Sequence, residues 1–221
     1  MVRQRGDGGR RPGRDVLVVG GGPAGLYAAQ RLAQQGLSVE VFEEHERIGE
    51  PVHCTGIVGA EVFALPGVPR TAVLAAPAAG RFHAPAGHSF TYAGQGEEVW
   101  VIDRGAFDRA LAERAVQAGA VVTTGARVVR IEVRPGEVAL EVQGRDGRQV
   151  RRAPVCLLAC GARYRFQRQL GLGLPPLLFG SAQTELPVPA ALATPADVRL
   201  PTALAAPGPG EWAGLAEWAE P

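Results

Sequence analysis

The hydrophobic pattern near the start of the chain predicts a strand, a helix and a second strand in immediate succession. Residues 16–19 are four apolar residues, three of them β-branched, which is typical of a strand buried on both faces. Residues 23–35 carry apolar side chains along one helical stripe, and Gly36 ends the segment. Residues 37–42 then predict another strand. Two strands joined through a helix are expected to pair in parallel, as in an α/β fold.

A second helix is predicted in the middle of the chain. Asp103 is a suitable N-cap, and residues 104–118 place Phe107, Leu111 and Ala115 at helical spacing. Gly119 ends the segment.

Strand-like runs surround this helix. They are residues 99–102, 120–124, 127–133, 137–143, 148–151 and 155–161. Pro135-Gly136 and Asp146-Gly147 predict turns, so residues 127–151 are expected to form an inserted β-meander. The apolar run 155–161 is expected to return to the buried parallel sheet. We therefore predict one central sheet made of residues 15–19, 38–42, 120–124 and 155–160.

The segments between these elements are less regular. Residues 44–57 are too polar and too broken by Gly and Pro for a helix or strand, so they predict a long loop on the ligand side of the sheet. Residues 61–80 are poorly patterned, and residues 81–83 and 88–92 suggest a hairpin across which His83 and His88 face each other. Two histidines without a third ligand do not predict a metal site.

The first strand runs directly into a G-x-G-x-x-G fingerprint. Gly20 allows a tight turn, Gly22 lets the backbone approach a pyrophosphate, and Gly25 lets the helix pack closely on the strand. Glu43 follows the second strand, at the distance from Gly20 where such units place the acid that binds a ribose diol. A carboxylate there disfavours the additional phosphate of NADP. A glycine-rich turn that binds nothing is the alternative, but the strand, helix, strand and acid together favour a dinucleotide site.

Composition narrows the function classes. All 23 basic residues are arginine, and the formal net charge is +1, which argues against a nucleic-acid binder. Residues 1–14 are basic and lack an apolar stretch, so they predict a disordered tail and neither a signal peptide nor a membrane span.

The three cysteines do not predict a disulfide framework. Cys156 and Cys160 would lie roughly 13 Å apart in an extended strand. That is beyond the ~7 Å that a disulfide spans between Cα atoms. We therefore expect reduced cysteines and a cytoplasmic protein.

The C-terminal part has little pattern. Residues 177–184 suggest one more strand, whereas residues 185–221 are rich in Ala and Pro and end among two tryptophans. Since exposed tryptophans on a tail are unfavourable, we expect that a normal domain would continue here. The expected organisation is a disordered tail at 1–14, a cofactor domain at 15–184, and a disordered tail or the start of a further domain at 185–221.

Two motifs carry a resemblance to the geranylgeranyl reductase family of FAD-dependent oxidoreductases, within the class built like para-hydroxybenzoate hydroxylase. One is the acid and loop at residues 43–56, E-E-H-E-R-I-G-E-P-V-H-C-T-G, which is similar to the acid and I-G-x-P-V-x-C loop of that family. The other is the run D-R-G-A-F-D-R-A-L at residues 103–111, which resembles its D-R-x-x-F-D-x-x-L helix start. The resemblance spans about residues 15–183.

This resemblance implies an α/β fold: a Rossmann-like FAD-binding domain with a parallel central sheet and an inserted β-meander. It implies bound FAD, with the pyrophosphate at residues 20–25, the adenosine ribose on Glu43, and Arg104 beside the ribityl and phosphate groups. The cofactor-binding candidates are Gly20, Gly22, Pro23, Ala24, Gly25, Glu43, Glu44, Cys54, Thr55, Gly56, Arg104, Val128 and Gly161. Cys54 is the candidate catalytic residue, and an inert core thiol is its alternative. Arg104 has the alternative of pairing only with Asp108.

Members of this family reduce isoprenoid double bonds, so the implied substrate is an isoprenoid lipid or another small molecule. Peripheral membrane contact stays open, and the oligomeric state is not predicted. The chain departs from the class pattern A-D-G-A-x-S by reading A-C-G-A-R-Y at residues 159–164, and it lacks the later G-D motif. We therefore expect most of the substrate domain to be missing, FAD binding to be micromolar at best, and isoprenoid reduction to be absent. A flavin monooxygenase of the aromatic hydroxylase type and a non-catalytic FAD-binding remnant are the alternative functions.

Overall fold

A computed structural model describes residues 13–77, 79–83, 87–93 and 99–176. The predicted tail before Gly13, the strand predicted at residues 177–184 and the predictions for residues 185–221 lie outside the described residues.

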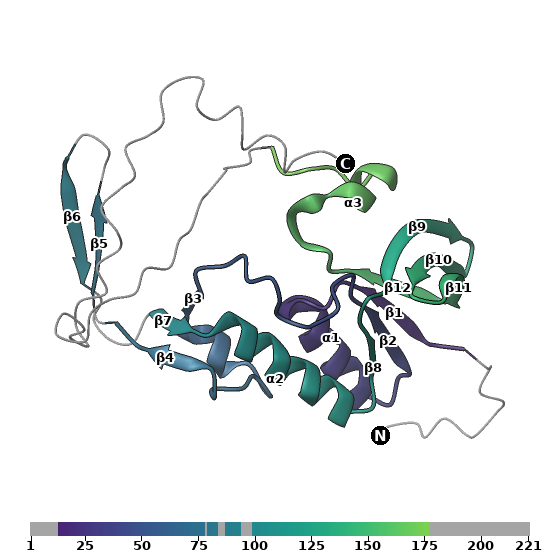
Figure 1. Cartoon of the computed structure of the whole chain (residues 1–221), viewed down its shortest axis with the longest axis horizontal. Coiled ribbons are helices and arrows are strands. Elements are labelled where there is room, and N and C mark those ends of the chain that lie inside the picture. Colours follow the sequence, from purple (N-terminus) through teal and green to yellow (C-terminus); the bar gives the residue numbers. More distant parts are fainter. Residues whose placement is uncertain (1–12, 78, 84–86, 94–98, 177–221) are drawn as a thin grey trace, which may run out of the picture.

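The centre of the fold is a parallel sheet of four strands in the order β12-β1-β2-β8 (Figure 1). Its strands are β1 (Val16–Val19), β2 (Val39–Phe42), β8 (Val121–Thr123) and β12 (Val155–Leu158). In register, Val16 pairs with Val39 on one side and with Val155 on the other. The predicted central sheet is confirmed, with strand ends that differ by one or two residues.

Two helices cover one face of this sheet. They are α1 (Pro23–Gln34) and α2 (Arg104–Gln117). Pro23 occupies the first turn of α1, where its missing N–H is not needed, and the Asp103 carboxylate accepts the Ala106 N–H to cap α2. The buried cluster between helices and sheet consists of small and β-branched residues, Val16, Val18, Ala29, Ala33, Val39, Val41, Ala115 and Ala120. These small side chains let the helices lie close to the sheet.

The predicted meander covers the other face. It is formed by β9 (Arg127–Arg134), β10 (Glu137–Gly144) and β11 (Gly147–Ala153), which pair in the order β11-β10-β9 (Figure 1). Leu17, Phe42 and Leu140 are buried in the cluster between the meander and the central sheet. Phe166 of the short α3 (Arg165–Gln169) closes the same cluster.

The burial predicted for residues 155–161 is only half correct. β12 pairs with β1 as expected, but its side chains alternate, with Val155 53% exposed and Leu157 36% exposed. The reason is its position. Cys156 and Leu158 pack on the cluster below the meander, whereas the cluster below the helices contains no residue of β12, which pairs with β1 alone among the described strands.

The structure also contains a small sheet that the pattern does not predict. Its strands, in the order β3-β7-β4, are β3 (Ile57–Gly59), β7 (Val99–Ile102) and β4 (Val73–Ala75). Only β7 matches a predicted strand, because β3 and β4 are three residues long, too short for periodicity to reveal. Trp100 of β7 stacks on Phe63 of the 3-10 helix η1 (Ala60–Ala64), with ring centroids 4.5 Å apart.

The predicted hairpin is present as β5 (Ala79–His83) and β6 (Ser89–Ala93), and it pairs outside the central sheet (Figure 1). Its register pairs His83 with Ser89, one residue away from the expected pairing of His83 with His88. The rings of Phe82 and Phe90, which are paired in register, stack at 4.9 Å between centroids.

Candidate functional site

A pocket of about 840 Å³ lies at the carboxyl ends of β1, β2 and β12. The segments that line it are the turn after β1, the loop at residues 43–54, the first turns of α2, the residues around the start of β9, and the turn after β12. This is the edge of a parallel α/β sheet where ligands bind.

The glycine turn has the geometry that its sequence predicts. Gly20 has φ +108°, and a Cβ there would collide with the Ala159 carbonyl oxygen. A Cβ on Gly25 would collide with the Gly20 carbonyl oxygen, so the first turn of α1 packs on β1 only with glycine at this position. A Cβ on Gly22 would meet no heavy atom within 4 Å beyond its chain neighbours, and Gly22 lines the pocket. The turn therefore exposes backbone to the pocket at the N-terminus of α1, where an anion is stabilised.

Glu43 is fixed at the end of β2. Its Oε2 accepts the Gly21 N–H at 2.7 Å, and its Oε1 accepts the His45 N–H at 3.0 Å. The His45 Nδ1 lies 2.5 Å from the same Oε1. The Glu43 side chain is 12% exposed. These contacts orient the carboxylate beside the glycine turn, so it can accept hydroxyl groups from a ligand that lies over that turn.

Glu44 joins three segments at the rim of the pocket. Its Oε1 lies 2.8 Å from Arg163 Nη1, after β12, and its Oε2 lies 3.5 Å from Arg127 Nε, at the start of β9. Both arginines are more than half exposed, so each pair contributes little to stability.

The loop at residues 47–56 is fastened to the start of α2. Gly49 has φ +79°, and a Cβ there would lie 2.8 Å from the Gly105 carbonyl oxygen. Gly56 has φ +72°, and its carbonyl accepts the Ile102 N–H at 2.8 Å. Positive φ and close backbone contact both require glycine, so these two positions determine where the loop lies.

Arg104 and Asp108 face the pocket from the first turns of α2. Arg104 Nε and Nη2 donate to Asp108 Oδ1 at 3.3 and 3.2 Å, and Nη2 donates to Oδ2 at 3.1 Å. Arg104 also contacts the Cys54 side chain. Burial raises the pKa of Asp108 although Arg104 lowers it, and the Glu43 charge raises it further. Burial alone would lower the pKa of Arg104, but the hydrogen bonds and charges of Asp108 and Cys54 together raise it.

The structure brings most of the predicted site residues together. The pocket is lined by Gly20, Gly22, Glu43, Glu44, Cys54, Arg104, Val128 and Gly161. Five other candidates do not line it: Pro23, Ala24 and Gly25 form the first turn of α1, and Thr55 and Gly56 lead into β3.

Several pocket residues are not indicated by the sequence. His45 and Arg127 line the pocket; His45 lies within the loop motif but has no role assigned there, and Arg127 lies in no motif. Only the position of His45, two residues after Glu43, could have indicated that it touches that carboxylate. Of the two other cysteines, Cys156 lies in β12 and Cys160 just after it. Burial raises the pKa of Cys156 to about 12, so its thiol is inert at neutral pH.

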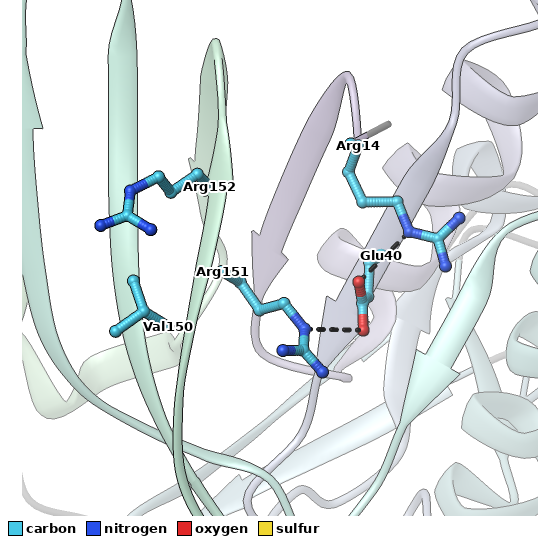
Figure 2. Close-up of a pocket in the computed structure, with 6 residues that line it drawn as sticks. Arg14, Glu40, Val150, Arg151 and Arg152 are labelled. Atoms are coloured by element: carbon cyan, nitrogen blue, oxygen red, sulfur yellow. Dashed lines mark hydrogen bonds and ion pairs between the residues drawn. The ribbon is translucent and has the colours of Figure 1, made fainter. Parts of the chain in front are cut away.

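A second hollow, of about 480 Å³, lies around the buried Glu40 of β2 (Figure 2). Glu40 Oε2 lies 3.2 Å from Arg14 Nε, and Oε1 lies 3.9 Å from Arg151 Nε of β11. The Arg152 side chain is directed away from Glu40, and its Nε lies 3.4 Å from Glu137 Oε1. Glu40 therefore links the segment before β1 and the meander to the central sheet.

Two further findings concern the described residues alone. None of their helices is both long enough and apolar enough to cross a membrane. Their His, Cys, Asp and Glu side chains form no group of three that could hold a metal ion.

Comparison with protein families gives one match. Residues 18–65 match the NAD(P)-binding Rossmann-like domain. These residues hold the second half of β1, the glycine turn, α1, β2 and the loop.

The chain also matches curated reductases. It is 35% identical over 161 residues to digeranylgeranylglycerophospholipid reductase 2 of Methanopyrus kandleri, and the match covers 72% of this chain and 40% of that protein. A second reductase of similar name, from Methanosphaerula palustris, is 35% identical over 163 residues, which cover 72% of this chain and 41% of that protein. The chain thus spans about two fifths of the length of the curated relatives it matches.

Solved structures agree with this match. A geranylgeranyl bacteriochlorophyll reductase-like protein from Thermoplasma acidophilum superposes with a TM-score of 0.63 at 28% identity, over 72% of this chain and 42% of that protein. An aklavinone-11 hydroxylase, solved with FAD and aklavinone, has a TM-score of 0.58 at 22% identity, over 72% of this chain and 35% of that protein. The hydroxylase shares the fold alone.

Proposed function

We propose that this chain, which is related to the N-terminal portion of the geranylgeranyl reductase family, binds FAD in the pocket at the carboxyl ends of β1 and β2. The observation that carries the proposal is the glycine turn with its fixed acid. Gly22 presents backbone to the pocket, and the Glu43 carboxylate is held beside it by the Gly21 N–H. A pyrophosphate over the turn and a ribose diol on Glu43 fit these groups.

The remaining candidates divide between the two halves of the cofactor. Val128 and Gly161, which also line the pocket, are proposed to border the adenosine. Arg104 is proposed to lie beside the ribityl and phosphate groups, and Cys54 beside the flavin ring. Pro23, Ala24 and Gly25 would act through the N-terminus of α1, and Thr55 and Gly56 through the position of the loop. Glu44 would close the rim.

We propose that the reaction served by this domain is flavin-dependent reduction of an isoprenoid double bond. The matched relatives from Methanopyrus kandleri and Methanosphaerula palustris are named as reductases of an isoprenoid phospholipid. Bound flavin would supply the hydride, and the protein residues would orient it and exclude water. Aromatic hydroxylation is less well supported, since the aklavinone-11 hydroxylase shares the fold at only 22% identity.

We also propose a cellular location for this protein. None of the three cysteines, Cys54, Cys156 and Cys160, forms a disulfide in the described chain, which supports a reducing, cytoplasmic location. A lipid substrate would require contact with a membrane surface, so we propose transient peripheral binding there.

Two measurements test these proposals in order. Isothermal titration with FAD and with NADP tests the site, and we expect binding of FAD alone. Anaerobic photoreduction of the FAD complex, followed by addition of geranylgeranyl diphosphate, tests the chemistry. Reoxidation of the flavin on addition of that lipid would support isoprenoid reduction. FAD binding without reoxidation would support the cofactor site and contradict a complete reductase in this chain.

A further inference from the structure

Asp108 is a buried carboxylate whose position is unusual for a residue that only stabilises a helix. It lies in the second turn of α2, faces the pocket, and has a side chain 10% exposed. Its partner Arg104 is 20% exposed, so the pair is largely shielded from water. Both oxygens of Asp108 accept from Arg104, at 3.1 to 3.3 Å, which fixes the plane of the guanidinium.

A contribution to the stability of the fold does not explain why Arg104 and Asp108 form a buried ion pair. Burial raises the pKa of Asp108 despite the adjacent guanidinium, and the Glu43 charge adds to the rise. Ionised Asp108 is therefore less favourable in the folded chain than in the unfolded chain. Buried ion pairs of this kind often contribute nothing to stability, because desolvation offsets their attraction.

The contacts of Arg104 indicate what the pair does instead. Arg104 reaches from α2 to the Cys54 side chain, in the loop at residues 47–56. The same loop also packs its Ile48 side chain on the cluster that holds Phe107 and Ile102, and its backbone meets α2 and β7 where Gly49 lies against Gly105 and Gly56 accepts the Ile102 N–H. Arg104 is thus a side-chain link between α2 and the part of the loop that lines the pocket.

We propose that Asp108 is a positioning residue: it holds the Arg104 guanidinium in the orientation that contacts Cys54, and so keeps the loop in place at the proposed flavin end of the pocket. The part of this proposal that concerns the flavin end of the pocket rests on the proposed function. The structural core of the proposal, control of Cys54 through Arg104, is independent of any cofactor.

The test is the rate of alkylation of each cysteine by iodoacetamide, followed by peptide mass spectrometry on the apo chain. Asp108→Asn keeps the shape of the side chain and removes its charge. We expect Cys54 to react roughly tenfold faster in this variant. Arg104 loses the charged hydrogen bonds that fix it, the loop is then no longer held against α2, and the reagent gains access to the Cys54 thiol. The rate of Cys160, which lines the pocket just after β12, should stay unchanged, and the partly buried Cys156 should stay almost unmodified.

Two controls separate positioning from a loss of stability. Glu113→Gln removes an exposed carboxylate from the same helix and should change no rate. In an Arg104→Met background, the added Asp108→Asn change should have no further effect on Cys54, because the residue through which Asp108 acts is gone.

Three results would overturn the proposal. They are an unchanged or slower Cys54 rate in Asp108→Asn, a parallel rise at all three cysteines with a lower melting temperature, and a persistent Asp108 effect without Arg104. None of them bears on cofactor binding, which the FAD titration tests separately.

Discussion

The two ends of the pocket are built in different ways. The glycine end, residues 20–25, is backbone from one continuous segment between β1 and α1, and its neighbours leave room only for glycine at Gly20 and Gly25. The loop end consists of side chains from separate segments, with Cys54 in the loop and Arg104 and Asp108 on α2. Backbone at the glycine end is held by the sheet and the helix, whereas the loop end also includes side-chain contacts, among them the Arg104–Asp108 pair.

This difference decides how each end should respond to substitution. A side chain added at the glycine end occupies the space of the ligand, so the effect on binding is large. A side chain altered at the loop end loosens contacts that water can partly replace, so the effect is smaller and depends on pH.

Substitution of Gly22 is expected to have the largest effect on FAD binding. Its backbone conformation, φ −81° and ψ 179°, is open to any residue, so Gly22→Val should fold normally. The valine side chain would occupy the space beside the turn and prevent FAD binding. Gly144→Val, at the end of β10 and away from the pocket, is the matched control. Isothermal titration that gave equal FAD affinity for wild type and Gly22→Val would refute the glycine end as the pyrophosphate site.

Glu43→Ala should have the next largest effect. It removes the acceptor proposed for the ribose diol, and loss of a charged hydrogen bond costs about 1.5–3 kcal/mol, or roughly 10- to 100-fold in FAD affinity. The same change should reduce discrimination against NADP, because the carboxylate no longer repels the 2′-phosphate. Titration with both nucleotides checks this, and Glu141→Ala on β10 serves as the control. Undiminished rejection of NADP by Glu43→Ala would show that another group sets the preference.

At the loop end, Arg104→Met should weaken FAD binding about tenfold. This is the loss in affinity expected when one charged hydrogen bond between Arg104 and the cofactor is removed. Methionine keeps the length and the apolar part of the side chain, so Asp108 loses its partner while the packing of α2 stays. Arg109→Met, on the same helix and exposed, is the control, and isothermal titration with FAD is the measurement. If Arg104→Met left FAD affinity unchanged, Arg104 would serve only as the partner of Asp108.

The smallest expected effect is the pH dependence of stability that Asp108 causes. Its folded-state pKa is raised by burial, with Arg104 and Arg109 opposing the rise and Glu43 adding to it. The stabilising contribution of protonated Asp108 is therefore present in acid and is lost as pH rises through the raised pKa. The melting temperature of wild type minus that of Asp108→Asn should fall between acid and neutral pH, by no more than about 4 °C. A difference that grows with pH would show that the ion pair outweighs burial.

The sequence predicted the fold where one local pattern determined each element. The apolar run of β1 predicted burial on both faces, and the turns at Gly136 and Gly147 located the meander. The glycine end was predicted because its fingerprint lies within one βαβ unit, where Gly25 packs against the Gly20 carbonyl. The contact of Gly20 with Ala159, after β12, was not predicted.

The loop end and the small sheet could not be predicted in this way. β3 and β4 have three residues each, and β7 lies between them in space although it follows both in the chain. The contact of Arg104 with Cys54 joins residues fifty positions apart through backbone approaches at Gly49 and Gly56. The partial exposure of β12 depends on what covers each of its faces, which its own residues do not encode.

The measurement that tests the proposed cofactor site most directly is a titration of the purified chain with FAD, followed by the change in the visible flavin spectrum. We predict saturable binding of one FAD per chain, with a spectral shift that is absent in Gly22→Val. A visible spectrum that stays that of free FAD at every protein concentration would contradict the proposed site.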